Sequence, residues 1–138
     1  MKALLPFPDF EEIPHKADAA LIIYGLSLPE VFSHAVLGMY HIMGIIGKNQ
    51  RKVEDRIVLQ ASDSETMLVA FLTELLFLAE TGIKAEVFEL NINRNILNAK
   101  IYKTPVSSIA KEIKAVTFNE MKIIKKDDIY QTKIVFDI

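Results

Sequence analysis

Apolar and polar residues follow two different periods along this chain, and each period predicts one kind of element. Residues 19–24 form an unbroken apolar run that ends at Gly25, which is typical of a buried strand. Residues 88–92 and 97–101 alternate instead with a period of two, and the Asn-Arg-Asn cluster at 93–95 predicts a hairpin turn. Apolar and β-branched runs predict further strands at residues 10–14, 53–61, 115–118, 121–126 and 129–137.

Two longer segments carry apolar residues at spacings of three and four, which predicts helices. The first begins at a capping box formed by Ser27 and Glu30 and is predicted to end at Gly47. The second begins at a capping box within residues 62–65 and ends at Thr81-Gly82. Its apolar residues cover most of its circumference, so we expect a central helix packed on more than one surface.

The chain after residue 101 is expected to be less regular. Pro105 is predicted to end the preceding strand, residues 107–112 to form a short helical turn, and Asp127-Asp128 to form a tight turn. Together the elements predict the α+β class, with a mostly antiparallel sheet packed against two main helices. No linker or shift of composition divides the chain, so residues 1–138 are predicted to form a single domain.

Composition narrows the classes of function. The chain has 138 residues, of which 51% are hydrophobic and 25% charged, and this balance is typical of a folded protein. The lack of cysteine excludes a disulfide framework, a thiol nucleophile and a cysteine-ligated metal, and it fits a reducing cytoplasm. The formal net charge of −2 disfavours autonomous binding to nucleic acid, which usually needs a basic surplus, although a local patch is not excluded.

No signal peptide or membrane segment is predicted. Prolines and acidic residues interrupt the N-terminal stretch, where a signal peptide needs a continuous apolar core. The most apolar run, residues 67–79, contains Thr73 and Glu74 and is shorter than the roughly 20 apolar residues of a spanning helix. We therefore expect no membrane partner.

Most catalytic signatures are absent from the sequence, including a glycine-rich phosphate loop, a His-Glu-x-x-His motif and a Gly-x-Ser-x-Gly motif. His34 and His41 lie two turns apart on the first predicted helix, too far apart to share one ion, and we expect them on its polar face. His15 lies in a turn beside Asp18, where a hydrogen-bonding role is the simplest interpretation.

Asp18 and Asp137 are the carboxylates that most suggest a function. Each stands at the end of an apolar strand, where a charge is costly unless it is paired or bound to a cation. If the two strands are neighbours, the carboxylates converge and, with backbone carbonyls, make a hard-oxygen site suited to Ca²⁺ or Mg²⁺ and poor for zinc. Ordinary solvent-facing acids are the alternative. Lys114 stands at the start of an apolar strand, and the sequence leaves two interpretations for it: an ordinary surface residue or a residue with a function.

Five segments, taken in order, resemble the archease family. They are HKADAALIIYG (15–25), SLPEVFSHAVLGMY (27–40), LVAFLTELLFLAET (68–81), IKAVTFNEMKI (113–123) and IVFDI (134–138), and they span nearly the whole chain. The resemblance implies a small cytoplasmic protein that is not itself an enzyme. Archeases activate the RtcB-type RNA ligase of tRNA splicing and RNA repair, by promoting guanylylation of the ligase's active-site histidine and repeated turnover. Contact with tRNA or RNA is then indirect, through the ligase.

The resemblance also implies a divalent-metal site. Its ligands map onto Asp18, Asp137 and the carbonyl of Ile138, with Ca²⁺ the expected ion and Mg²⁺ or Mn²⁺ as alternatives. The family's functional lysine maps onto Lys114. We expect Lys114 and His15 to contact the partner protein or a nucleotide.

The sequence departs from the family pattern at five positions. Lys16 replaces a usual Thr, Ala19-Ala20 replaces Ile/Val-Gly, Ala70 replaces a common acid, and Asn119 stands where a His is frequent. We expect these changes to alter affinity or partner choice more than the fold. Two other classes of function stay open: a chaperone-like interaction module with a purely structural ion, and a small metal-dependent hydrolase. The sequence shows no evidently placed general base for the hydrolase.

Overall fold

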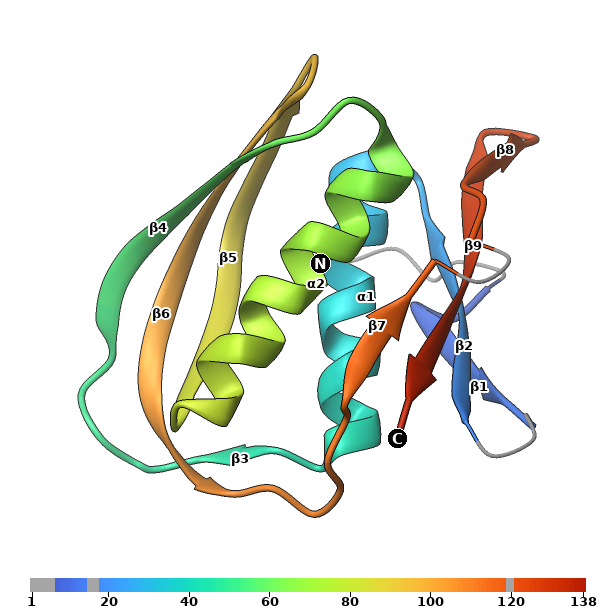
Figure 1. Ribbon diagram of the computed structural model, residues 1–138. Helices are drawn as coiled ribbons and strands as arrows, with labels where there is room; N and C mark the ends of the chain where they lie inside the picture. The colour runs from blue at the N-terminus through green and yellow to red at the C-terminus, as the bar shows by residue number, and fades with distance from the viewer. Residues whose placement is uncertain (1–6, 15–17, 119–120) are drawn as a thin grey trace.

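The computed structural model describes residues 7–14, 18–118 and 121–138, and it consists of two antiparallel sheets with two helices between them (Figure 1). In chain order the elements are β1 (Phe10–Ile13), β2 (Ala19–Gly25), α1 (Leu28–Met43), β3 (Ile46–Gly47), β4 (Val53–Gln60), α2 (Ser64–Glu80), β5 (Ile83–Asn93), β6 (Ile96–Ser108), β7 (Ala115–Thr117), β8 (Ile124–Lys126) and β9 (Ile129–Asp137).

One sheet has the strand order β1-β2-β9-β7, with β8 also paired with β9; the other has the order β3-β6-β4, with β5 also paired with β6. Every strand pair is antiparallel, so the predicted α+β class is confirmed. The strands divide between two sheets, where the sequence pattern suggested one. The physical reason is the apolar circumference of α2, which needs cover on more than one side.

The first helix begins as predicted and ends earlier. The Ser27 side chain accepts a hydrogen bond from the Glu30 N–H at 3.2 Å, which caps the first turn. The predicted end at Gly47 is wrong, because the helix stops at Met43 and Gly44 adopts a left-handed conformation with φ of +57°. The Gly44 N–H then donates to carbonyls of the last turn, which closes the helix.

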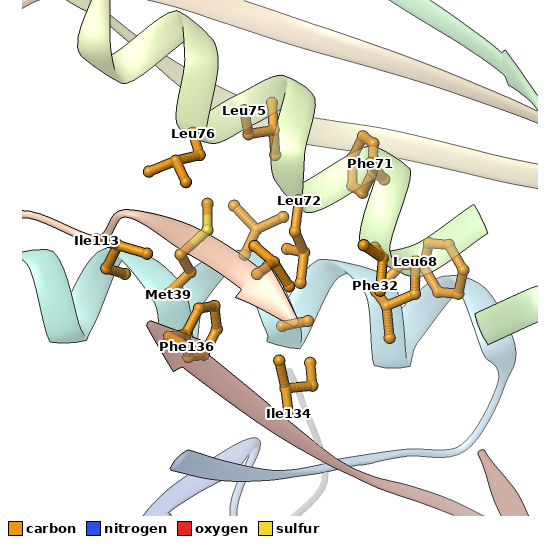
Figure 2. Packing of buried hydrophobic residues seen from close by; sticks show 14 of the residues in the cluster. Phe32, Met39, Leu68, Phe71, Leu72, Leu75, Leu76, Ile113, Ile134 and Phe136 are labelled. Carbon is orange, nitrogen blue, oxygen red and sulfur yellow. The ribbon is translucent and has the colours of Figure 1, made fainter. Parts of the chain in front are cut away.

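The second helix is the central element that the sequence predicted. The predicted capping box at residues 62–65 is wrong, because the N-cap is Asp63 and its side chain accepts from the Thr66 N–H at 2.7 Å. This bond holds the pKa of the Asp63 carboxyl below its usual value. Thr81 caps its end, as expected. Figure 2 shows its buried side chains packed against those of α1 and β9, in a cluster that includes Phe32, Met39, Leu68, Phe71, Leu72, Leu75, Leu76, Ile134 and Phe136. No described helix is long and apolar enough to cross a membrane.

Two predictions about the segment after residue 101 are wrong. Strand β6 continues through Pro105 to Ser108, because Pro105 pairs with Ile83, the first residue of β5, where a missing N–H costs the ladder little. Residues 107–112 form no helical turn. The N–H groups of Ala110 and Lys111 instead donate to the Met43 carbonyl, at 2.9 and 3.0 Å, and hold the segment against the end of α1.

Tyr40 joins α1 to the edge of the second sheet. Its hydroxyl donates to the Ala85 carbonyl at 2.7 Å and accepts from the Ala85 N–H at 3.2 Å, so it satisfies both backbone groups of an edge-strand residue. Burial raises the pKa of Tyr40 to about 12, which favours the neutral phenol.

We expect Tyr40→Phe to lower the free energy of unfolding by about 1–3 kcal/mol, because two buried backbone groups lose their partner. The wild type should also lose stability between about pH 10 and pH 12, since the unfolded tyrosine gives up its proton first. Urea unfolding across this pH range should show a smaller loss in the variant. An equal loss in both proteins would contradict this role of Tyr40.

Candidate metal and partner-binding site

The antiparallel register of β2 and β9 brings the two predicted carboxylates to the same end of the first sheet. Ala19 pairs with Phe136 in this register, so its continuation by one residue sets Asp18 opposite Asp137. Directly opposite residues have Cβ atoms about 4.5–5.5 Å apart, and like charges at such positions repel. A cation between the two carboxylates would remove that repulsion.

Strand β7 brings Lys114 to the same end of the sheet from the other side of β9. Ala115 pairs with Asp137, and the Lys114 N–H donates to the Asp137 carbonyl at 2.7 Å. Continuing this register sets Lys114 opposite Ile138. The Lys114 side chain is exposed, so its ammonium is open to solvent at the end of the sheet that carries the carboxylates.

The donors at this end fit a hard cation. The predicted ligands are two carboxylates and the backbone carbonyl of Ile138, and Ca²⁺ or Mg²⁺ would prefer such an all-oxygen set, whereas zinc prefers nitrogen and sulfur. Within residues 7–14, 18–118 and 121–138, no three His, Asp or Glu side chains form a metal-binding group. An ion held here would therefore need water or a partner's oxygens to complete its coordination. His15, the remaining predicted site residue, lies outside the described residues.

A groove that the sequence analysis missed lies between α2 and β7, directly beside Lys114. It has a volume of about 300 Å³ and is lined by Thr73, Leu76, Phe77, Glu80, Lys114, Ala115 and Val116. Phe77 is 57% exposed, although it belongs to the otherwise buried central helix. The spacing of residue 77 could have predicted this exposure, because residues 70, 73, 77 and 80 form the solvent-facing stripe of α2. The groove adds an apolar surface next to the candidate ion site.

The two helical histidines differ in their surroundings, and the prediction for His34 is wrong. His34 is only 5% exposed and its Nδ1 lies 2.6 Å from the Tyr24 carbonyl, so this nitrogen donates. Its Nε2 faces the Asp9 carboxylate at 3.6 Å. His41 is exposed as expected, with Nε2 3.7 Å from a Glu12 carboxylate oxygen. His34 is thus a structural tie between α1 and the end of β2.

The positions that depart from the family pattern have different structural settings. Ala19 and Ala20 are buried in β2, so small side chains there serve packing. Ala70 is partly exposed on the stripe of α2 that also carries Phe77. Lys16 and Asn119 lie outside the described residues.

Comparison with known proteins gives one consistent match. Residues 10–138 match the sequence model of the Archease protein family (MTH1598/TM1083). The chain is 31% identical over 140 residues to the protein archease of Methanosarcina acetivorans, covering 94% of this chain and 95% of that protein. It is 32% identical over 137 residues to the protein archease of Sulfolobus acidocaldarius, covering 94% and 98%.

Two solved structures share the fold. The solution structure of Methanobacterium thermoautotrophicum protein 1598 has a TM-score of 0.71 and 27% identity, and the match covers 94% of this chain and 99% of that one. The crystal structure of a Thermotoga maritima archease, described as a possible chaperone, also has a TM-score of 0.71, at 22% identity, and the match covers 99% and 100%.

Proposed function

This chain belongs to the archease family, and from that premise we propose that it is a protein cofactor that activates an RtcB-type RNA ligase in the cytoplasm. It promotes guanylylation of the ligase's active-site histidine and lets the ligase turn over repeatedly during tRNA splicing or RNA repair. The ligase, and not this protein, grips the RNA. This division of roles agrees with the net charge of −2.

The observation that supports this proposal most is the strand register, whose continuation sets Asp18 opposite Asp137 and Lys114 opposite Ile138 at one end of the first sheet. We propose that the two carboxylates and the Ile138 carbonyl hold Ca²⁺, with Mg²⁺ or Mn²⁺ as alternatives. Guanylylation of a histidine builds negative charge on the departing phosphates. A bound divalent cation supplies positive charge to such groups.

Lys114 has a separate role in this proposal. Its exposed ammonium adds a second positive charge beside the carboxylates, directed at the triphosphate or at acidic groups of the docked ligase. The backbone of Lys114 is fixed by its bond to Asp137, which keeps the side chain at this end of the sheet.

We expect Lys114→Ala to slow activated guanylylation by about ten-fold or more, because a charge-assisted contact is lost. The measurement is a time course of labelled-GTP incorporation into the ligase encoded in the same genome, with and without this protein. Lys111→Ala is the matched control, since it removes another exposed lysine three residues away. Equal rates for the two variants would remove Lys114 from the mechanism, and no acceleration by the wild type would refute the proposed function.

A chaperone-like interaction module with a purely structural ion is the second candidate, and the groove beside Phe77 is the feature that favours it. Under this alternative, chelation lowers the melting temperature of the protein. Lys114→Ala then leaves ligase activation untouched, so the same guanylylation assay separates the two proposals.

A further inference from the structure

The second sheet has an uncovered face, which we call the outer face. Ile57, Leu97 and Ala99 point from β4 and β6 toward the helices, so the alternate residues of these strands point away from them. Figure 1 shows both helices on the opposite side of the sheet. The strand registers set the outer-face residues in four rows across β4, β6 and β5: Glu54, Tyr102, Glu86; Arg56, Lys100, Glu89; Val58, Asn98, Asn91; and Gln60, Ile96, Asn93.

The second row holds an unusual pair of charges. Arg56 and Lys100 stand directly opposite each other, and like charges at such positions destabilise a sheet. Lys100 is paired on its other side with Glu89, at 3.0 Å between Nζ and Oε2. The Arg56 guanidinium has no ion-pair partner within the part of the chain that the structure describes. The row therefore lacks one anion.

The rows beside this pair are rich in amides. Asn91 and Asn98 stand directly opposite each other, and Asn93 lies two residues along β5. Asparagine is disfavoured in strands, so three on one face of a hairpin suggest a role other than folding. Among the described residues, none of the three carboxamides has a hydrogen-bond partner. Each offers two donors and one acceptor to a ligand.

These side chains surround a hollow. Its volume is about 370 Å³, and its walls are Arg56, Glu89, Asn91, Asn93, Ile96, Asn98 and Lys100. This volume lies within the usual range for small-molecule sites, which is roughly 300–1,000 Å³. A ligand that fits the hollow has an anionic group for the two cations, hydrogen-bonding edges for the amides and an apolar surface for Ile96.

We propose that this hollow is a nucleotide-binding site, with the phosphate between Arg56 and Lys100 and the edge of the base against Asn91 and Asn98. A guanidinium and an ammonium side by side suit a phosphate, and paired carboxamides suit the mixed donors and acceptors of a base. The site belongs to the second sheet, whereas Asp18 and Asp137 belong to the first, so it does not depend on the proposed cofactor role.

The test is calorimetric titration of the full chain with each of the four ribonucleoside 5′-monophosphates, with the nucleosides and with inorganic phosphate. At least one monophosphate should bind about ten-fold more tightly than its nucleoside or inorganic phosphate. Arg56→Gln should weaken that binding about ten-fold, and Asn98→Ala should weaken the nucleotide but not inorganic phosphate. Arg51→Gln, which removes an exposed arginine outside the hollow, is the control and should bind like the wild type.

A single-stranded RNA hexamer distinguishes a free nucleotide from one within a chain, and it should bind more weakly than the free monophosphate. Melting temperatures should not fall in any variant, because every substituted side chain is at least partly exposed and Arg56→Gln removes one of two like charges. The proposal is overturned if no monophosphate binds more tightly than inorganic phosphate, if Arg56→Gln binds like the wild type, or if only the hexamer binds.

Discussion

Replacing both Asp18 and Asp137 with asparagine is expected to abolish activation of the ligase, returning guanylylation to the rate of the ligase alone. The two carboxylates are the charged donors of the proposed ion site, and an amide oxygen is a much weaker ligand for a hard cation. Calcium affinity, measured by calorimetry, should fall by more than about ten-fold with the loss of these charge-assisted contacts. Added calcium should raise the melting temperature of the wild type and not that of the double variant.

The matched control is Asp127→Asn with Asp128→Asn. It removes two charges from an exposed turn, where both residues have positive φ, and asparagine tolerates that conformation. This control should activate the ligase and bind calcium like the wild type. If the double variant still activates the ligase fully, the metal mechanism is wrong.

Phe71→Ala is expected to have the largest effect on stability, a loss of about 3–5 kcal/mol in the free energy of unfolding. Phe71 is fully buried, and its ring centroid lies 6.2 Å from that of Phe32 on α1. Removing the ring leaves a cavity where the two helices meet (Figure 2). The loss is large compared with the total stability of a typical domain, which is about 5–15 kcal/mol.

The matched control lies on the same helix, because Phe77 is 57% exposed. Phe77→Ala should change the free energy of unfolding by less than about 0.5 kcal/mol. Urea unfolding of both variants measures the difference. If Phe77→Ala destabilises the protein as much as Phe71→Ala, then Phe77 is buried and not exposed, and the groove between α2 and β7 is not open to a partner.

Short sequence motifs predicted several features of the fold. The N-cap at Ser27, the turn at Asp127-Asp128 and the end of α2 at Thr81 were predicted correctly, because each depends on hydrogen bonds or backbone angles within a few residues. The end of α1 was not, since Gly44 and Gly47 are equally suited to stop a helix. A Cβ on Gly44 would lie 2.9 Å from the Ala110 Cβ, a contact that no local pattern reveals.

The burial of His34 was also missed. Its ring is covered because the end of β2 and Asp9 pack against α1. The helical spacing of residues around His34 does not predict either of these neighbours. The continuation of β6 through Pro105 has a similar cause, since it depends on where β5 begins.

By itself, then, the sequence determined the kinds of element, some of their limits, the apolar character of α2 and, through five ordered motifs, membership of a family. Only the tertiary structure decided which strands are neighbours. That choice set Asp18 opposite Asp137 on one sheet and Arg56 opposite Lys100 on the other. The reason is that pairing between distant strands depends on burying the apolar face of each sheet against the helices. The free energy of that burial comes from contacts across the assembled core, so no short stretch of sequence determines it.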